Sequence, residues 1–309
     1  MKKVAFLFPG QGSQSIGMGK DFFDNSDVAK EIISSASDVV GFDFKELMFE
    51  QNDNLAKTEF TQPAIFLVSA IANKLLRDNI DIKPEFLLGH SLGEFSAINS
   101  AGALSINDGV KLVNQRGKLM QSACADIEAG MMVLLGLSDE KVEELCKVAQ
   151  GNGKKVWAAN YNSDGQIVAA GMKSDLQDME SIFKEAGAKR VMLLDMSVAS
   201  HCPILQIAAD GLLVGLESSI SDSFVTAVIS NANASAYNTK SDAVKLLQEQ
   251  LVKPVLYKQS ISKFDSEIDI FIELGGKVLK GINKKVTKVP THCVTDMKSL
   301  EAAIEELNS

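Results

Sequence analysis

The chain has 309 residues, of which 46% are hydrophobic and 23% are charged, and its formal net charge is −9. This composition excludes an intrinsically disordered chain, and the length predicts one large domain, alone or with a small one. The acidic balance argues against binding of nucleic acid or of an anionic membrane surface, although a local basic patch could still contact an acidic partner.

The cysteines and the apolar runs indicate the compartment. Cys124, Cys146, Cys202 and Cys293 form no C-x-x-C pair and no metal-type spacing, so we expect four reduced thiols and no metal site. The apolar run at residues 4–8 is too short for a signal peptide, and no run approaches the ~20 apolar residues of a membrane span. We therefore expect a cytoplasmic protein, with a monomer as the default.

Short apolar runs alternate with segments of helical period along most of the chain. Such alternation predicts an α/β fold, a mostly parallel sheet with helices on both faces. The expected strands are residues 4–8, 86–90, 224–230 and 268–274. The expected helices are residues 63–76, about 92–101, about 106–122 and roughly 241–251.

The middle of the chain follows a different order. Its expected elements are strand 130–137, helix 139–149 with Ser138 as N-cap, strands 155–160 and 166–171 joined by the turn-rich YNSDG, helix 174–186 and strand 188–194. This β-α-β-β-α-β order is the ferredoxin-like pattern. The sequence thus predicts a small subdomain over 127–197, inserted in a large domain made of 1–126 and 198–309.

Ser91 occupies the centre of G-x-S-x-G, the strand-to-helix turn that exposes a serine nucleophile. The residues before it favour a strand and those after it a helix, while Gly89 and Gly93 permit a tight turn. The helix start offers free N–H groups to an oxyanion, with the Leu92 N–H as the first donor. An ordinary βα turn in which Ser91 only caps the helix is the alternative.

A serine nucleophile needs a base, and the chain has three histidines. His90 points to the opposite side of the turn from Ser91, and His292 lies in an expected late strand, where a structural role is favoured. His201 follows the last strand of the insert, and a loop there can reach a neighbouring turn, so we predict His201 as the base.

The group that orients the base stays open at this point. The Ser, Asp, His order of α/β-hydrolases selects Asp195, but Asp195 lies only six residues before His201. Either Asp195 is a surface residue, or a carbonyl oxygen orients the base instead.

Two further segments carry candidate binding residues. The glycine-rich FPGQGSQSIGMG has neither the third glycine of G-x-G-x-x-G nor the P-loop pattern around Lys20. We expect instead a backbone loop close to a substrate, with Gln11 between two glycines able to donate. Arg116, in a helical segment, is either solvated or buried beside Ser91, where it would bind a carboxylate with two hydrogen bonds.

Together these segments resemble the malonyl-CoA–acyl carrier protein transacylases of bacterial fatty-acid synthesis, over essentially the whole chain. One landmark alone would be weak, whereas eight in the correct order are highly specific. The eight are FPGQGSQSIGMG, TQPAIF (61–66), GHSLGE (89–94), NQRGKLMQ (114–121), NYNSDGQIVAAG (160–171), VASHC (198–202), QLVKPVLY (250–257) and ELGGKVLKG (273–281).

The resemblance implies a hydrolase-like core with a ferredoxin-like insert and a ping-pong transfer of malonyl from malonyl-CoA to acyl carrier protein. Ser91 would be the nucleophile and His201 the general base, with the Leu92 N–H and Gln11 as the oxyanion hole. Phosphopantetheine would belong to the carrier protein, so the resemblance implies no cofactor for this chain.

The resemblance also assigns the remaining groups. Arg116 would pair with the malonyl carboxylate, and Gln250 would supply the carbonyl that orients His201, which removes the need for Asp195. The chain departs from the family pattern at Ala199, at Asp164 and in ELGGK, which is one residue short.

Five lysines could contact the acidic carrier protein, namely Lys277, Lys280, Lys284, Lys285 and Lys288. Lys189-Arg190 are a second candidate for this contact. The alternative for either group is a solvated helix face without a partner.

Two other functions compete with this prediction. A serine esterase or thioesterase would use Ser91, Asp195 and His201 as its triad. A non-catalytic module that binds carrier protein or coenzyme A would not need the complete set of serine, histidine and arginine.

Overall fold

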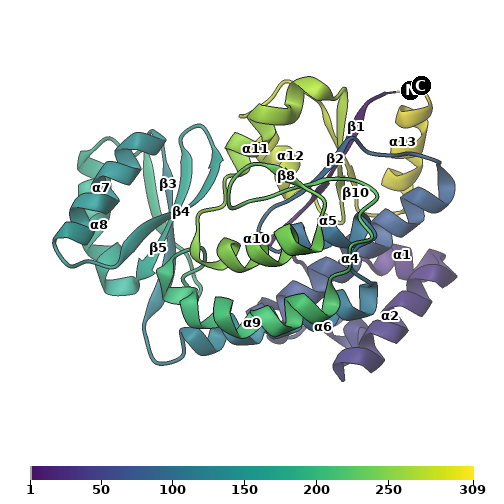
Figure 1. The fold of residues 1–309 in the computed structure, drawn as a ribbon, viewed down its shortest axis with the longest axis horizontal. Helices are drawn as coiled ribbons and strands as arrows, with labels where there is room; N and C mark the ends of the chain where they lie inside the picture. Colours follow the sequence, from purple (N-terminus) through teal and green to yellow (C-terminus); the bar gives the residue numbers. More distant parts are fainter. Residues whose placement is uncertain (1) are drawn as a thin grey trace.

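The structure is a computed structural model that describes residues 2–309. Within this range the strands form two sheets (Figure 1). Sheet A, as far as the chain is described, has six strands in the order β10-β9-β1-β2-β7-β8, all parallel except the β7–β8 pair. The four strands of sheet B over the same residues are antiparallel, in the order β4-β5-β3-β6. The α/β fold class is therefore confirmed.

Sheet A and its helices form the larger part of the molecule. Its strands are β1 (Val4–Phe8), β2 (Phe86–Gly89), β7 (Val228–Ile229), β8 (Ala236–Tyr237), β9 (Ile270–Leu274) and β10 (Thr291–Val294). Its helices are α1 (Lys20–Asn25), α2 (Asp27–Val40), α3 (Phe44–Phe49), α4 (Thr58–Asn79), α5 (Gly93–Ser100), α6 (Ile106–Ala123), α9 (Gln206–Ser219), α10 (Lys240–Val252), α11 (Tyr257–Phe264), α12 (Val278–Asn283) and α13 (Met297–Asn308).

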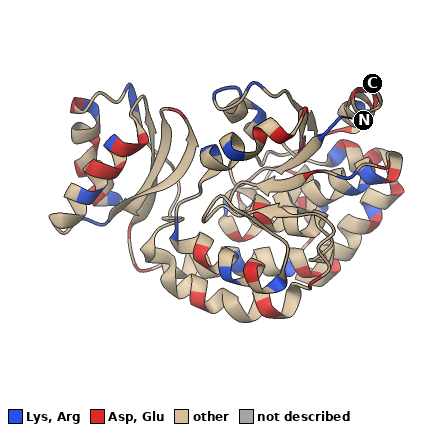
Figure 2. Cartoon of the chain, turned by 45° about the horizontal axis from the view of Figure 1, so that its top comes forward, with Lys and Arg blue, Asp and Glu red and all other residues tan. Residues whose placement is uncertain are grey.

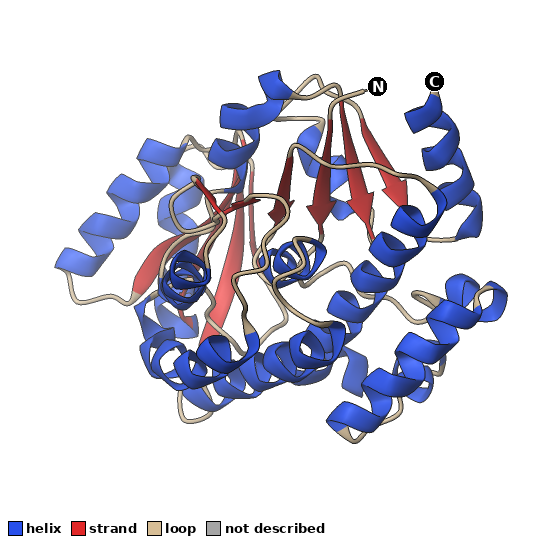
Figure 3. Cartoon of the chain, turned by 45° about the vertical axis from the view of Figure 1, so that its right-hand side comes forward, coloured by secondary structure: helices blue, strands red, loops and turns tan. Residues whose placement is uncertain are grey.

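Both faces of sheet A are buried, as the continuous apolar run of β1 predicts. Along β1, Phe6 and Phe8 join the core that contains α4, α5 and α6. Ala5 and Leu7 point to the opposite face and pack with apolar residues of α11 and α12. Figure 2 shows acidic and basic residues interspersed along the outer helices, and Figure 3 shows helices on both sides of the strands.

Helix α4 begins five residues earlier than the predicted start at Pro63. Proline was expected near the first turn because it lacks an N–H group and cannot donate to a carbonyl four residues back. Here that carbonyl, the Glu59 oxygen, accepts a hydrogen bond from the Asn114 side chain at 2.8 Å. The side chain from α6 compensates for the missing bond, so that the helix extends through the proline.

The strand predicted over 224–230 is wrong in length, because β7 covers only Val228–Ile229. The preceding residues leave the sheet: the Val225 N–H donates to the Ala101 oxygen at 2.8 Å, beside the end of α5. The hydrophobic run is thus divided between the sheet and a loop contact, which its composition does not reveal.

Sheet B and two helices form the smaller part, at the left of Figure 1. It consists of β3 (Ala129–Leu135), α7 (Asp139–Gly151), β4 (Val156–Ser163), β5 (Gln166–Met172), α8 (Lys173–Glu185) and β6 (Arg190–Leu193). All four strands fall within the 127–197 segment, and their order is that of a ferredoxin-like sheet. Ser138 caps α7 as predicted, accepting from the Lys141 N–H at 3.3 Å.

The predicted five-residue linker YNSDG is wrong, because β4 continues to Ser163 and leaves only Asp164 and Gly165 as the turn. Gly165 has a φ of 66° there, a conformation that glycine adopts without strain. Tyr161 and Ser163 pair with β5, so polar composition concealed a buried strand end.

Two further properties of residues 2–309 concern membranes and metals. Among these residues, no helix combines the length and the hydropathy that a bilayer crossing requires. The same residues contain no group of three or more His, Cys, Asp or Glu side chains arranged to bind a metal ion. The four cysteines are free thiols, three of them buried.

Candidate active site

Ser91 lies in a sharp turn between β2 and α5, at the carboxyl edge of sheet A. Its φ is 53°, in the left-handed region that non-glycine residues rarely adopt. Glycine is required on both sides of the turn. A Cβ at Gly89 would lie 1.8 Å from the carbonyl carbon of Gly93, and a Cβ at Gly93 would lie 2.0 Å from the Phe8 oxygen. The two glycines thus permit the tight turn predicted from the motif.

Two side-chain amides bind the backbone of Ser91. The Asn231 Oδ1 accepts from the Ser91 N–H at 2.6 Å, while the Asn231 Nδ2 donates to the Gly89 oxygen at 2.7 Å. The Gln250 Nε2 donates to the Ser91 oxygen at 3.0 Å. We call Asn231 and Gln250 the amide clamp, because together they hold both peptide groups of the strained residue.

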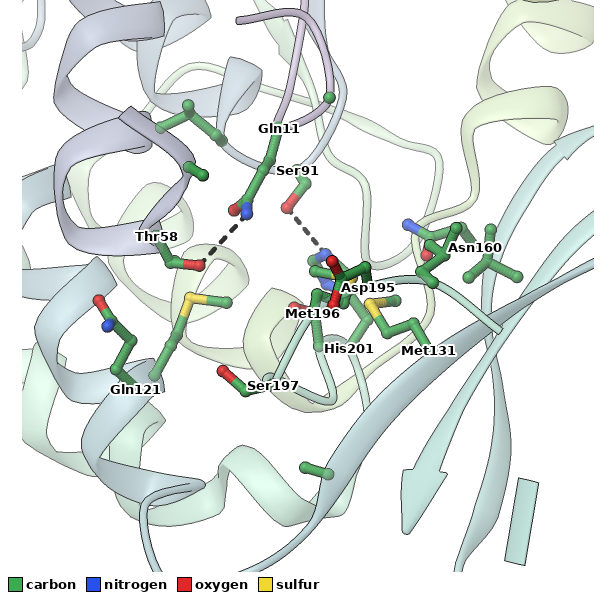
Figure 4. Close-up of a pocket in the computed structure, with 18 of the residues that line it drawn as sticks. Gln11, Thr58, Ser91, Gln121, Met131, Asn160, Asp195, Met196, Ser197 and His201 are labelled. Carbon is green, nitrogen blue, oxygen red and sulfur yellow. Dashed lines mark hydrogen bonds between the residues drawn. The ribbon is translucent and has the colours of Figure 1, made fainter. Parts of the chain in front are cut away.

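His201 lies directly beside the serine (Figure 4). Its Nε2 is 2.8 Å from the Ser91 Oγ, and its Nδ1 is 2.7 Å from the Gln250 carbonyl oxygen. A carbonyl can only accept, so the proton lies on Nδ1 and the Nε2 lone pair faces the serine hydroxyl. Burial, and next the charge of Arg116, lower the pKa of His201 to about 3, so the imidazole is neutral at neutral pH.

Asp195 does not orient this histidine. It lines the same cavity but is exposed, and it has no hydrogen bond to His201 or to any other described residue. Of the two alternatives left by the sequence, the carbonyl of Gln250 is the one that contacts the base. The Ser91–Asp195–His201 triad of the competing esterase is therefore not assembled.

Arg116 is buried in α6 with its guanidinium against the serine. One nitrogen, Nη2, lies 3.2 Å from the Ser91 Oγ and 3.1 Å from the Gln250 Oε1, while Nη1 donates to the Gln62 Oε1 at 2.7 Å. The guanidinium carbon lies 5.4 Å from the centre of the Phe95 ring. Of the solvated and buried alternatives for Arg116, the buried one is correct: the residue is 1% exposed.

The charge of Arg116 persists despite burial. Burial lowers its pKa to about 10, and the negative charge of Glu94 opposes that shift, so the guanidinium is protonated at neutral pH. Helix α6 comes this close to α4 because of Gly117, where a Cβ would lie 2.6 Å from the Glu59 Cα. A fixed positive charge beside the nucleophile is suited to binding a carboxylate on the substrate.

Two backbone N–H groups, those of Leu92 and Gln11, make no hydrogen bond with any residue in the described range. Both residues line the cavity around Ser91. The loop that follows β1 lies close to the turn that contains Ser91, since a Cβ at Gly10 would lie 2.4 Å from the His90 oxygen. The Gln11 side chain is turned aside and donates to the Thr58 Oγ1 at 3.2 Å (Figure 4), which leaves its backbone N–H as the available donor.

Comparison with known proteins agrees with this geometry. The chain matches the acyl transferase domain family over residues 5–290. The malonyl CoA-acyl carrier protein transacylase of Haemophilus influenzae is 37% identical over 312 residues, covering 99% of this chain and 100% of the relative. The Bacillus subtilis protein of the same name is 38% identical, over 99% of this chain and 98% of its own length. The chain belongs to the malonyl CoA-acyl carrier protein transacylase family.

Solved structures of the transacylase family have the same fold along the whole chain. The malonyl-CoA:acyl carrier protein transacylase from Helicobacter pylori is 48% identical, with a TM-score of 0.97 over 100% of this chain and 99% of that one. A malonyl-transacylase in complex with a type II PKS acyl-carrier protein is 33% identical, with a TM-score of 0.93 over 98% and 99% of the two chains.

In this transacylase family member the site opens into a cavity of about 820 Å³ between the two parts of the molecule. Ser91, Arg116 and His201 line this cavity. Met131 and Asn160 from sheet B line it as well, and Figure 4 shows them with Ser91 and His201. The cavity is thus shared by the large domain and the ferredoxin-like sheet.

The other two histidines occupy different places. The ring of His90 bonds away from the Ser91 hydroxyl: its Nε2 lies 2.8 Å from the Asn162 Oδ1 on β4, which connects the Ser91 turn to sheet B. Burial lowers the pKa of His90. His292 lies in β10, the expected late strand, where it is half-buried.

Sequence reasoning missed three residues: Asn231, which binds the backbone of Ser91, and Glu94 and Tyr237, which bind each other. Glu94 belongs to the GHSLGE segment, and a charged residue three positions after the nucleophile was a signal that it could face inward. Asn231 and Tyr237 lie about 140 residues further along the chain, and only the parallel pairing of β2 with β7 brings them to the same edge of the sheet.

Proposed function

We infer that this chain transfers the malonyl group of malonyl-CoA to the phosphopantetheine thiol of acyl carrier protein through a malonyl-serine intermediate on Ser91. This inference rests on one observation: His201 and Arg116 both lie against the hydroxyl of Ser91. The Ser91 Oγ lies 2.8 Å from the His201 Nε2 and 3.2 Å from the Arg116 Nη2. A nucleophile with its base and a fixed cation fits an acyl group that carries a carboxylate.

The first half of the reaction loads the enzyme. His201 takes the proton of Ser91 through Nε2 while Oγ attacks the thioester carbonyl carbon, and the oxyanion that forms accepts from the N–H groups of Leu92 and Gln11. The C–S bond then breaks, and the departing coenzyme A thiolate takes the proton from His201. The products are malonyl-serine and free coenzyme A.

The second half reverses these steps with a different thiol. The phosphopantetheine thiol gives its proton to His201 and attacks the malonyl-serine carbonyl, and the proton returns to the Ser91 Oγ as the ester bond breaks. Both thiols are leaving groups of similar ability, so the transfer is nearly balanced. Hydrolysis is the competing reaction, and it is suppressed by excluding water from the loaded site.

Arg116 selects the acyl group. In a malonyl group one methylene separates the thioester carbonyl from the carboxylate, so a cation adjacent to the nucleophile lies within reach of that carboxylate. Arg116 is fixed from three elements, by Gln62 on α4, Phe95 on α5 and Gln250 on α10. An acyl group that lacks the carboxylate would leave this buried charge without a partner.

The carrier protein is expected to dock on exposed basic residues of the chain. The five lysines between residues 277 and 288 are all exposed, and none makes an ion pair with a described residue. Replacing Lys284 and Lys285 with glutamate should raise the KM for carrier protein and leave formation of malonyl-serine unchanged. If the KM does not change, Lys189 and Arg190 become the candidates.

The chain is proposed to act as a cytoplasmic monomer without a cofactor. Its four free thiols are consistent with a reducing compartment. The reaction described above uses only side chains and backbone groups of the chain, so it requires no bound group beyond its two substrates.

Intact-mass measurement tests the function directly. After mixing with malonyl-CoA, the wild-type protein should gain the mass of one malonyl group, and addition of acyl carrier protein should remove it. The Ser91→Ala protein should gain nothing. A wild type that never forms the adduct would disprove the transfer, and an adduct lost equally fast without carrier protein would indicate a thioesterase.

A further inference from the structure

A carboxylate is buried directly behind the nucleophile turn. Glu94, in the first turn of α5, is 0% exposed. Its Oε2 accepts from the Asn231 N–H at 3.0 Å and from the Gln250 Nε2 at 2.7 Å, and its Oε1 accepts from the Tyr237 hydroxyl at 3.0 Å. All three neighbours donate, which is the arrangement that an ionised carboxylate requires.

Glu94 therefore binds both members of the amide clamp. The Gln250 Nε2 is shared between the Glu94 Oε2 and the Ser91 oxygen, while Asn231 binds Glu94 through its backbone and Ser91 through its side chain. Ser91 has a left-handed φ of 53°, which persists only where neighbouring groups over-determine it. Among the described hydrogen bonds, Glu94 is the common anchor of the groups that do so.

The negative charge of Glu94 also lies near the positive charge of Arg116. The Nδ1 of His201 faces a neutral carbonyl, so the imidazolium formed during transfer has no carboxylate in contact with it. Arg116 adds a positive charge, which lowers the pKa of His201 further. The titratable groups facing Glu94 are Arg116 on α6 and Tyr237 on β8, and of the two only Arg116 is charged at neutral pH.

We propose that Glu94 is a positioning residue for acyl transfer, which fixes Ser91 through the amide clamp and whose negative charge balances Arg116 while His201 is protonated. This inference rests on the transfer proposed above. Glu94 touches neither substrate nor base and acts through Gln250, Asn231 and Arg116. It supplies, from behind the serine, the negative charge that a Ser-His-Asp triad carries on the far side of the histidine.

The pH dependence follows from the same arrangement. Burial raises the pKa of Glu94 to about 7, against the opposing effect of its hydrogen-bond donors and Arg116. Its charged form is therefore present above pH 7 and is lost as the pH falls below it. His201 stays neutral over this range because its own pKa is about 3. A loss of kcat near pH 7 on the acid side is thus expected from Glu94 and not from the base.

Glu94→Gln separates the charge from the hydrogen bonds. A glutamine can still accept from Asn231 and Gln250 with its oxygen and donate to the Tyr237 oxygen with its nitrogen. Glu273→Gln is the matched control: Glu273 on β9 is also 0% exposed and accepts from the Leu279 and Lys280 N–H groups, but it contacts no residue of the site.

The test compares kcat and KM for malonyl transfer between pH 5 and 9 in the wild type and both variants. Glu94→Gln should lower kcat about 10- to 100-fold at pH 8 with KM within about threefold, and its rate should stay flat where the wild type declines. Glu273→Gln should keep the kcat and the pH profile of the wild type.

Two results would overturn the proposal. One is a Glu94→Gln kcat within twofold of wild type. The other is a wild-type kcat that does not decline between pH 8 and pH 5, a measurement that needs no variant and applies even if Glu94→Gln fails to fold. Either result, obtained with a wild type that forms the malonyl adduct, leaves the proposed function standing, whereas a missing adduct removes the function itself.

Discussion

Two strand-to-helix connections at the carboxyl edge of sheet A, β2–α5 and β9–α12, each combine a buried glutamate with one residue of left-handed φ. Ser91 is in the β2–α5 turn and Glu94 follows it in α5, whereas Glu273 is in β9 and Gly275 follows it in the β9–α12 turn. Both glutamates are fully buried; Glu94 accepts one backbone N–H, that of Asn231, and Glu273 accepts two, those of Leu279 and Lys280. The residue of left-handed φ is Gly275 at 85° in one turn and Ser91 at 53° in the other.

The difference shows where backbone strain is tolerated in this molecule. Gly275 needs no side-chain support, and its N–H donates to the Val294 oxygen of the neighbouring strand at 2.9 Å. Ser91 has a Cβ in the same region of φ, which costs roughly 1–2 kcal/mol, and it is held by the amide clamp on both of its peptide groups. The strained turn is the one that contains the proposed nucleophile.

Removing the Ser91 hydroxyl should have the largest effect of the substitutions in these two turns. Ser91→Ala keeps the Cβ and the clamp but loses the nucleophile, so malonyl transfer should fall by about 10⁴-fold or more while the free energy of unfolding changes by less than about 1 kcal/mol. Steady-state kinetics and urea unfolding measure the two quantities. A variant that retains a tenth of the rate would show that Ser91 is not the nucleophile.

The next effect concerns the charge beside the strained turn. Arg116→Ala should lower kcat/KM for malonyl transfer by roughly 10²- to 10³-fold, because the carboxylate loses its paired cation. Transfer of an acetyl group should fall much less, so the ratio of the two rates is the quantity to measure. An equal fall for both acyl groups would mean that Arg116 only supports the fold.

In the turn that contains Gly275, a substitution should change the free energy of unfolding. Gly275→Ala would place a Cβ 2.7 Å from the Ser69 Cα at a positive φ, and should lower the free energy of unfolding by about 3 kcal/mol. Gly153→Ala is the matched control, with a φ of 83° and no atom within 4 Å of the added Cβ, and should lower the free energy of unfolding by only about 1 kcal/mol. Equal losses in the two variants would show that the contact with Ser69 contributes nothing.

The smallest effect tests the strain itself. Ser91→Gly should be about 0.5–1 kcal/mol more stable than Ser91→Ala, because glycine adopts the left-handed conformation without a Cβ penalty. Both variants lack the hydroxyl, so the comparison isolates the backbone. Thermal unfolding monitored by circular dichroism resolves the difference, and a less stable Ser91→Gly would indicate that the turn is relaxed.

Much of the fold follows from patterns local to the sequence. The expected strands 4–8, 86–90 and 268–274 agree with β1, β2 and β9 to within two residues, because each is a short apolar run with burial on both faces. The order of elements in the insert was also predicted. The errors fell where a tertiary contact overrides composition, as at β7 and at the end of β4.

The residues of the site also divide into those that a local sequence pattern predicts and those that only tertiary contacts bring together. A serine between two closely placed glycines is a local signal, and so is a histidine in a loop after a strand. The group that orients His201 is a backbone carbonyl, which any residue type could provide, so only the family resemblance pointed to Gln250. Asn231 approaches Ser91 from 140 positions away through the pairing of strands, and no local pattern announces it.

The support of Arg116 has a consequence for substrate selection. Its guanidinium is fixed by an amide on α4, an aromatic ring on α5 and an amide on α10, three elements that belong to one packed core. The cation is therefore preorganised: its entropy of ordering is lost when the protein folds and not in each catalytic cycle. In the proposed transfer, discrimination between acyl groups would then depend on the electrostatic free energy of pairing the substrate carboxylate with Arg116, and would need no conformational change.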